Sequence, residues 1–267
     1  MRNLQPGVVI IAHDNDAISY TKIAAWNARR IKQYIGLPVA LITSSDVIEG
    51  FDDIIKVEKP KSQLRHFADV GERVEWANQG RWQVYDLSPY DHTILIDADY
   101  IVNSDVLNIL VDTDYDLLAV RDNFDVTNLT DFAAHATVGQ ARLPAYWATV
   151  LSFRKSMFAR TVFERWRMVA ENWQHYLELY RINRRLFRND YALSIAINAA
   201  SGYCPQTVKA IPWSVATVLP EHEIELADGR WKVKFVDANN RVRFVEIHNQ
   251  DLHIMGKNNL QKLINET

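Results

Sequence analysis

The chain of 267 residues is 48% hydrophobic and 24% charged, with a net charge of −3 at pH 7. This length and composition predict a folded protein with a sizeable core, and the mild negative charge excludes an overall basic surface for nucleic acid or membranes. The single cysteine, Cys204, excludes an internal disulfide and a cysteine-based zinc site. No apolar run reaches membrane length and Met1–Gly7 lacks a signal-peptide pattern, so a cytoplasmic location is expected.

The first elements follow an α/β pattern. Gly7–Ala12 is a continuous apolar run, which predicts a parallel strand buried on both faces. Helical spacing follows over Ile23–Ile35 and stops at Gly36, and Val39–Ile42 predicts a second strand, so the three elements form a βαβ unit. Further strands are expected at Ile54–Val57, Ile94–Ile96, Leu117–Val120 and Thr149–Phe153, with helices at Gly80–Leu87 and Leu107–Leu110.

The second half of the chain has fewer clear strands. Thr127–Arg142 lacks periodicity and is interpreted as an excursion that closes over a ligand. Phe158–Leu179 predicts one long amphipathic helix and Ala192–Ala200 a more buried one. Trp231–Val236 and Arg241–Ile247 predict a β-hairpin, so an α/β domain with a C-terminal extension is expected.

A pair of carboxylates follows the predicted strand Ile94–Ile96. Asp97 and Asp99 are separated by one residue, so both side chains are expected to point into the crevice where open α/β sheets bind ligands. Two carboxylates there form a hard oxygen site suited to Mg²⁺ or Mn²⁺ carrying a diphosphate. A capped surface turn is the alternative interpretation of the pair.

Four segments, taken in order, resemble the GT-A-fold glycosyltransferases, most closely the glycogenin-like family 8. They are Trp82–Leu87 with His92–Val102, Thr149–Ser156, Asn189–Leu193 and Leu252–Lys257. The resemblance implies an α/β fold of the Rossmann-like GT-A type, a mixed, mostly parallel sheet flanked by helices, with a C-terminal β-hairpin and helix extension. It implies one domain over residues 1–267, with a nucleotide-binding half (1–120) and a half for the acceptor and the metal and diphosphate segment (121–267).

The resemblance implies a metal-dependent transferase that moves a hexose or pentose from a nucleotide-sugar, with UDP as the expected nucleotide. Asp97, Asp99 and His253 would hold the ion, and an imidazole ligand favours Mn²⁺ over Mg²⁺. His248, five residues earlier, is the rival third ligand. Where the family commonly has Asn-Ser-Gly before the middle strand, this chain has Tyr146–Ala148, so the identity of the sugar stays open.

Other positions of the resemblance would contact the diphosphate. Gly256 and Lys257 follow His253, and the lysine would neutralise the diphosphate. Lys262 is the alternative, because the family's lysine lies further beyond the glycine. Arg81 precedes the helix that leads to the carboxylate pair and would reach donor phosphate or sugar; an exposed surface arginine is the other interpretation.

The resemblance implies that the residues after the first strand, His13, Asp14 and Tyr20, bind the nucleotide base and ribose. Asp14, beside His13, would accept a hydrogen bond from the base or a ribose hydroxyl, and Tyr20 would stack on uracil. Helix capping and helix packing are the alternatives for these residues. Asp190 is the catalytic candidate, as a general base if the configuration inverts or as a stabilising carboxylate if it is retained; helix capping is again the alternative.

A basic segment precedes Asp190 and is a weak candidate for binding the acceptor. A solvated charged face is the first interpretation, and contact with an anionic acceptor is the second. Its arginines are Arg181, Arg184, Arg185 and Arg188.

The acceptor is suggested by a second resemblance. Tyr20–Ile31 and Leu37–Thr43 resemble phage-encoded members of the superfamily, some of which glycosylate modified cytosines in DNA, including with arabinose. This implies hydroxylated or hydroxymethylated cytosine as an acceptor, in the host cytoplasm, with a glycan or a protein as the alternative. Two other classes remain, an inactive nucleotide-sugar-binding module and a nucleotidyltransferase, whose Gly-rich loop is absent from His13–Asp16.

Overall fold

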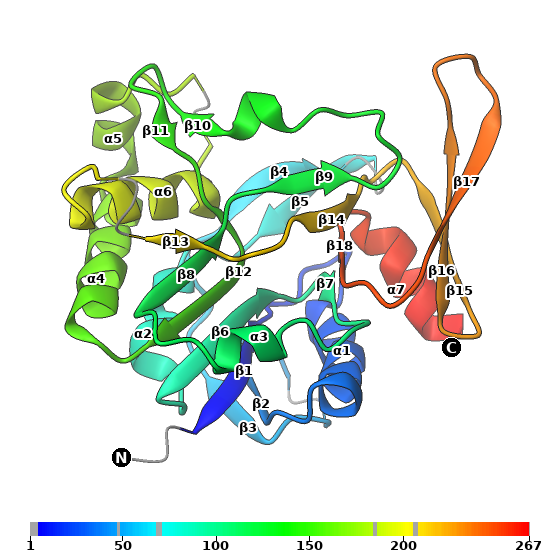
Figure 1. Cartoon of the computed structure of the whole chain (residues 1–267), viewed down its shortest axis with the longest axis horizontal. Coiled ribbons are helices and arrows are strands. Elements are labelled where there is room, and N and C mark those ends of the chain that lie inside the picture. Colours follow the sequence, from blue (N-terminus) through cyan, green and yellow to red (C-terminus); the bar gives the residue numbers. More distant parts are fainter. Residues whose placement is uncertain (1–4, 47–48, 68–70, 184–185, 205–207, 267) are drawn as a thin grey trace.

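A computed structural model describes residues 5–46, 49–67, 71–183, 186–204 and 208–266. Its centre is a seven-stranded sheet in the order β13-β8-β12-β6-β1-β2-β3 (Figure 1). The strands are β1 (Pro6–Ile11), β2 (Val39–Thr43), β3 (Asp53–Lys56), β6 (His92–Asp97), β8 (Leu117–Val120), β12 (Trp147–Arg154) and β13 (Lys209–Ala210). Neighbouring strands are parallel except around β12, which runs antiparallel to both β6 and β8. The predicted mixed, mostly parallel sheet is confirmed.

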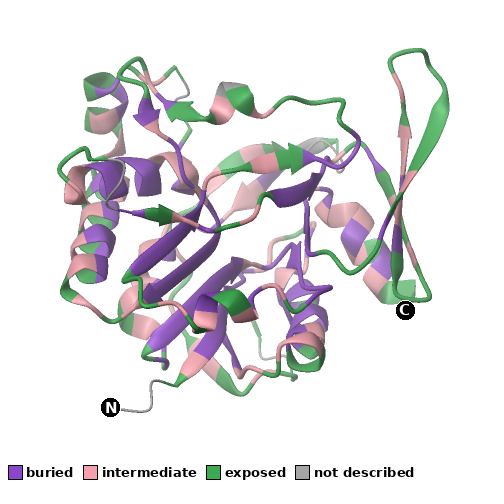
Figure 2. Ribbon diagram, in the orientation of Figure 1, coloured by how far each residue is buried: buried purple, intermediate pink, exposed green. Residues whose placement is uncertain are grey.

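Helices cover both faces of this sheet, which is why its central strands are apolar throughout. Val9 and Leu95 belong to a core cluster with residues of α4 and α6, whereas Val8 and Ile94 belong to a second cluster with residues of α1 and α3. Figure 2 shows the resulting buried strands at the centre of the molecule. The helices are α1 (Tyr20–Tyr34), α3 (Asn108–Val111), α4 (Met157–Glu171) and α6 (Asn189–Ala200).

Two predicted helices differ from those observed. The helix expected over Phe158–Leu179 is broken, because α4 ends at Glu171 and α5 (Trp173–Leu179) begins after Asn172. The Asn172 side chain donates to the Met168 carbonyl at 2.9 Å, a local bond of the kind that competes with the helix. The helix expected over Gly80–Leu87 is a 3₁₀ turn followed by a single short helix, η1 (Arg81–Gln83) and α2 (Val84–Leu87).

The segment Thr127–Arg142 is more regular than its sequence pattern indicates. It contains a 3₁₀ turn, η2 (Ala133–His135), and β10 (Thr137–Val138), which pairs antiparallel with β11 (Leu143–Pro144). The aromatic ring of Phe132 lies edge-on against Trp147, with centroids 5.7 Å apart. Closure of this segment over a ligand stays a prediction.

A second, smaller sheet adjoins the first and has the order β7-β18-β14-β9. Its strands are β7 (Tyr100–Ile101), β9 (Asn123–Asp125), β14 (Val215–Val218) and β18 (Leu252–Ile254). β7 follows β6 after a two-residue turn, so the turn carrying Asp99 joins the two sheets. The sequence pattern predicted none of these strands, and β7, β9 and β18 have only two or three residues each, too few to show an alternation.

Two further units complete the fold. The hairpin of β4 (Gln63–Phe67) and β5 (Glu72–Trp76) forms a two-stranded sheet, and β15 (Glu223–Ala227), β16 (Arg230–Val236) and β17 (Val242–Ile247) form a three-stranded one beside α7 (Lys257–Glu266). The predicted C-terminal hairpin and helix extension is confirmed, with β15 as an added strand (Figure 1). None of the described helices contains a stretch long and apolar enough to cross a membrane.

Candidate active site

A cavity of about 650 Å³ lies at the edge of the main sheet where β1 and β6 end and the antiparallel β12 begins. The other walls come from the β4–β5 hairpin, the start of α6, the end of β18 and the start of α7. Its lining includes Tyr20, Arg65, Trp76, Asn78, Arg81, Asp97, Asp99, Ala148, Arg188, Asn189, Asp190, His253 and Lys257.

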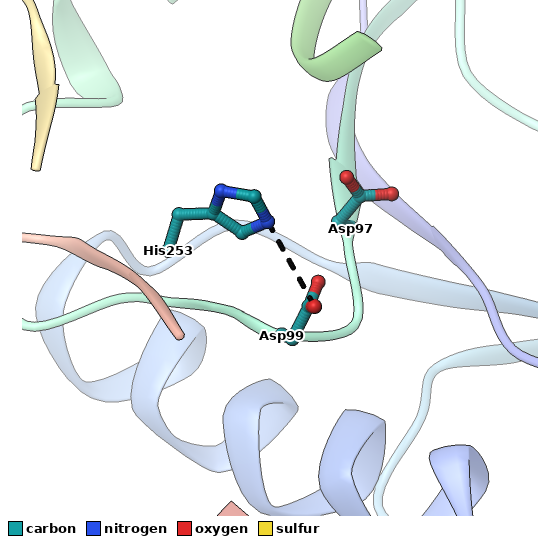
Figure 3. A group of neighbouring side chains, drawn as sticks. All are labelled: Asp97, Asp99 and His253. Atoms are coloured by element: carbon teal, nitrogen blue, oxygen red, sulfur yellow. Dashed lines mark ion pairs between the residues drawn. The ribbon is translucent and has the colours of Figure 1, made fainter. Parts of the chain in front are cut away.

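Asp97, Asp99 and His253 form one cluster in this cavity. Their potential ligand atoms all lie within 4.8 Å of one another, and His253 Nε2 is 3.8 Å from Asp99 Oδ2 (Figure 3). Asp97 is the last residue of β6, whereas His253 is opposite Tyr100 in the antiparallel β18–β7 pair. The Ile254 N–H also donates to the Asp99 carbonyl at 2.9 Å. Backbone pairing therefore brings together residues that lie more than 150 positions apart.

Each carboxylate of the cluster has its own cation. Arg81, which is 1% exposed, forms an ion pair with Asp97 and donates to the Ala148 carbonyl at 2.7 Å. Lys257 Nζ lies 2.6 Å from Asp99 Oδ2. The interpretation of Arg81 as an exposed surface arginine is wrong, because the partly exposed Asp97 carboxylate pairs with its buried guanidinium in the cavity wall.

Burial and these charges set the protonation of the cluster. Burial raises the pKa of Asp97 to about 7, against the effect of Arg81 and with a contribution from Asp99. Burial also acts on Asp99, but Lys257 and His253 outweigh it and hold the pKa of that carboxyl below its usual value. Burial lowers the pKa of His253, which keeps its imidazole neutral. Asp99 and His253 are therefore in the forms that bind metal ions.

The donor set of the cluster fits a divalent ion. Two carboxylates and a neutral imidazole suit Mn²⁺, for which mixed oxygen and nitrogen ligands are common. The ring nitrogen that faces the carboxylates is His253 Nε2, whereas Nδ1 is buried without a hydrogen-bond partner. The rival ligand, His248, is not part of the cluster. It is exposed just after β17, with its Nε2 3.8 Å from Glu246 Oε2.

Asp190 lies between this cluster and two arginines. Its Oδ1 accepts from the Ala148 N–H at 2.9 Å and its Oδ2 from Arg188 Nη2 at 3.1 Å. Its charge acts on Asp97 and His253, and also on Arg188. Because α6 has Arg188 as its N-cap residue, Asp190 belongs to the first helical turn, and the capping interpretation of Asp190 is wrong.

Of the three residues predicted to bind the nucleotide base and ribose, Tyr20 lines the cavity. Asp14 instead accepts from the Thr21 N–H and hydroxyl, both at 2.8 Å, and so stabilises the N-terminus of α1, which is the alternative considered for it. His13 Nδ1 is 2.8 Å from Ser44 Oγ, and burial lowers its pKa to about 4. Donor contacts of His13 and Asp14 stay predictions.

The structure places some of the remaining predicted residues at the cavity and others away from it. Gly256 precedes Lys257, and a Cβ on it would lie 3.3 Å from the Pro220 carbonyl, so glycine permits this close approach. Lys262 is exposed on α7. Of the basic segment, Arg188 lines the cavity and Arg181 is exposed, donating to Gln140 Oε1 at 3.3 Å. Arg184 and Arg185 lie outside the described residues.

Sequence reasoning missed one wall of the cavity. Arg65 and Trp76, from the β4–β5 hairpin, stack with the guanidinium carbon 3.4 Å from the ring centroid, and Asn78 and Asn189 line the cavity beside them. Asn189 Nδ2 donates to the Asn78 carbonyl at 2.8 Å. The available signal was two short alternating runs on either side of Gly71, a pattern typical of a hairpin.

No protein-family model matches the sequence, and no curated protein matches it. Among solved structures, the galactosyltransferase LgtC in complex with donor and acceptor sugar analogs is 17% identical, with 76% of this chain and 72% of that chain covered at a TM-score of 0.46. Glycosyltransferase GlyE of Streptococcus pneumoniae TIGR4 is 16% identical over 78% of this chain at a TM-score of 0.42, and the match covers 45% of GlyE.

A third solved structure, a putative glucose-1-phosphate thymidylyltransferase from Bacillus anthracis in complex with a sucrose, is 9% identical over 79% of this chain and 87% of that chain, at a TM-score of 0.42. The chain thus spans less than half of GlyE and most of the other two proteins. Likenesses of this size do not show a family, and the functional conclusion rests on the residues of the cavity.

Proposed function

We propose that the cavity is the active site of a metal-dependent glycosyltransferase, which moves a sugar from a nucleotide-diphosphate donor to an acceptor hydroxyl. The observation that carries this proposal is the cluster of Asp97, Asp99 and His253, with Lys257 on Asp99, inside a cavity large enough for a nucleotide-sugar. The ordered sequence resemblance to GT-A enzymes supports it independently.

The cluster and its cations suit a diphosphate leaving group. Asp97, Asp99 and His253 would hold a divalent ion, which would supply positive charge to offset the negative charge on the departing diphosphate. Lys257, 2.6 Å from Asp99, is placed to bind the diphosphate oxygens as a point charge. Arg81 holds Asp97 by an ion pair and is itself held by the Ala148 carbonyl, so it orients the carboxylate toward the cluster.

Asp190 is proposed as the catalytic carboxylate. Burial would raise its pKa, but Arg188 and the Ala148 N–H hold the pKa below its usual value, so the group is ionised at neutral pH. An ionised carboxylate accepts the proton of the acceptor hydroxyl in an inverting reaction, or stabilises a positive anomeric centre in a retaining one. The anomeric configuration of the product distinguishes the two roles.

The finer parts of the proposal are UDP as the nucleotide, Mn²⁺ as the ion, a hexose or pentose as the sugar, and modified cytosine in phage DNA as the first acceptor to test. The imidazole ligand supports Mn²⁺, and the phage-type sequence resemblance supports DNA. A DNA acceptor predicts duplex binding that weakens with salt and drops when Arg184 and Arg185 become Ala. Unaltered binding would leave a glycan or protein as the acceptor class.

A thermal-shift series tests the donor site. UDP with Mn²⁺ is expected to raise the melting temperature, because a ligand that binds the native state stabilises it, and EDTA is expected to abolish the shift. GDP, CDP and ADP serve as matched nucleotides. If no nucleotide shifts the melting temperature, the proposed function is wrong. Release of UDP from UDP-sugars separates an enzyme from an inactive nucleotide-sugar-binding module.

A further inference from the structure

The charged residues that line the cavity balance at one end and not at the other. At the carboxylate end, defined by Asp97, Asp99 and His253, Arg81 pairs with Asp97 and Lys257 with Asp99. At the arginine end, defined by Arg65, Trp76 and Arg188, two guanidinium groups share one carboxylate, that of Asp190. The arginine end therefore carries one excess positive charge.

Arg65 is the cation that lacks a partner of opposite charge. Its Nη2 donates to the Phe187 carbonyl, its guanidinium lies over Trp76, and no carboxylate of the described residues forms an ion pair with it. Its Nε is buried without a hydrogen-bond partner. Burial and the neighbouring Arg188 lower the pKa of Arg65 to about 10, against the attraction of Asp190, so its charge is held in an unfavourable environment.

Arg188 has the same unused donor. One of its Nη atoms binds Asp190 at 3.1 Å, whereas its Nε is buried without a partner. Burying an unpaired donor destabilises the folded state, and a like-charged neighbour adds to that cost. Both guanidinium groups line one cavity and have the single carboxylate of Asp190 near them, which indicates a ligand group that is itself anionic.

We propose that Arg65 and Arg188 bind an oxyanion of the acceptor substrate, a phosphate or a carboxylate. The inference rests on the proposed function, in which the donor diphosphate occupies the carboxylate end and leaves the arginine end to the acceptor. Guanidinium groups bind both oxyanions through forked hydrogen bonds, and the excess charge at this end is neutralised on binding. Asp190, between the two ends, then lies beside the acceptor hydroxyl.

The hairpin holds Arg65 in place for this role. Gln63 Nε2 donates to the Phe187 carbonyl at 2.7 Å, and the Phe187 N–H donates to Gln63 Oε1 at 3.1 Å. The rings of Trp76 and Phe187 lie 6.5 Å apart. These contacts join β4 to the residue before Arg188, so the two guanidinium groups are fixed beside each other before a ligand arrives.

Calorimetric titration of inorganic phosphate tests the proposal. The protein is first saturated with UDP and Mg²⁺, so that phosphate reports on the arginine end. We expect Arg65→Gln to weaken phosphate binding at least tenfold and Arg65→Lys, which keeps the charge but not the fork, to weaken it less. Arg73→Gln is the matched control, because Arg73 is exposed on the same hairpin. Acetate titrated in the same way distinguishes a carboxylate acceptor from a phosphate one.

The outcomes separate the two proposals. The oxyanion site is overturned if neither phosphate nor acetate binds the protein. It is also overturned if wild type and both Arg65 variants bind these anions equally. UDP that fails to bind both with Mg²⁺ and with Mn²⁺ contradicts the proposed function instead, and phosphate is then titrated into the nucleotide-free protein. There, too, an affinity that depends on Arg65 supports the site and an affinity independent of Arg65 overturns it. Melting temperatures of the variants report whether the hairpin still folds.

Discussion

The two ends of the cavity differ in what holds their side chains. At the carboxylate end, Asp97 lies on β6 and His253 on β18, and backbone ladders to β1 and β7 set the register of both strands. At the arginine end, Arg65 lies on a two-stranded hairpin that Gln63 joins to Phe187 through side-chain bonds. The first end is built into two sheets, whereas the second is attached to them.

The two ends of the cavity also differ in the balance of their charges. The carboxylate end has a cation for each carboxylate, and the arginine end has an excess of one. Side chains fixed by strand register suit a group with constant geometry, such as a diphosphate, because preorganised ligands bind without reordering. A hairpin wall suits a partner whose shape differs from one substrate to another. In the proposed reaction, the sheet-built end binds the donor and the hairpin-built end binds the acceptor.

Substitution of a proposed metal ligand is expected to impair the carboxylate end most strongly. Asp99→Asn removes a proposed direct ligand, and we expect the Mn²⁺-dependent affinity for UDP to fall about a thousandfold, since loss of an outer-shell partner alone costs 10–100-fold. Titration calorimetry with UDP and Mn²⁺ measures the change. Asp105→Asn, at an exposed carboxylate near the same turn, is the control. Retention of wild-type affinity in Asp99→Asn would exclude Asp99 as a ligand.

A buried carboxylate outside the cavity tests how firmly that end is built. Asp251 is 5% exposed and accepts from the Asn103 N–H and Ser104 hydroxyl, both at 2.8 Å, and from the Tyr100 hydroxyl at 3.1 Å. Asp251→Ala leaves three buried donors unpaired beside β7 and β18, so we expect the free energy of unfolding to fall by about 3 kcal/mol. Urea denaturation measures it. A loss as small as that of Asp105→Ala would contradict the role of this network.

The carboxylate end was largely predictable from sequence because its parts are strong local patterns. Gly7–Ala12 and Ile94–Ile96 are apolar runs that match buried strands β1 and β6, and Asp97 and Asp99 follow directly. What the pattern left open was the choice of histidine. Pairing between β18 and β7, two very short strands far apart in sequence, places His253 in the cluster, and no local pattern encodes such a pairing.

Long-range partners also explain what the sequence left open or missed. Arg81 had two interpretations, a donor contact and a surface residue, because its counter-ion, Asp97, is sixteen positions away and becomes its neighbour through tertiary packing. Arg65 was missed because the alternating runs of its hairpin are short and its partner Phe187 lies 122 positions away. Asp14 was given a donor contact and a helix-capping role as alternatives, and its bonds to Thr21, seven residues on, match the second while the first stays a prediction. The sequence readily indicated residues of catalytic and ligand-binding types, but it did not indicate their tertiary partners.

Low pH is expected to lower the stability of the protein, because the strands of the carboxylate end carry buried histidines. His92 in β6 is 2% exposed with Nε2 2.8 Å from Ser152 Oγ, and burial, with a contribution from Arg154, lowers its pKa to about 4. Unfolded histidine titrates near 6.5, so between pH 6.5 and 5 the unfolded state binds a proton that the native state excludes. Stability is present above pH 6.5 and falls with pH, by about 2 kcal/mol at pH 5.

Urea denaturation of His92→Gln at pH 6.5 and pH 5 measures this contribution. The variant is expected to lose less stability across the window than wild type, by about 2 kcal/mol. His175→Gln, at an exposed position on α5, is expected to retain the full wild-type dependence. Identical pH dependence in wild type and His92→Gln would show that His92 titrates normally in the native protein.

A substitution that loosens the hairpin is expected to affect ligand binding at the arginine end and not at the carboxylate end. Gln63→Leu removes both hydrogen bonds to Phe187 and frees the hairpin from the segment before Arg188. Because Gln63 is half-buried and water replaces part of what is lost, the free energy of unfolding is expected to fall by about 1 kcal/mol. The affinity for UDP with Mn²⁺ is expected to stay at the wild-type value, while phosphate binding at the arginine end weakens about fivefold. Equal weakening of both ligands would mean that the hairpin supports the whole cavity, and that the division between a sheet-built and a hairpin-built end is wrong.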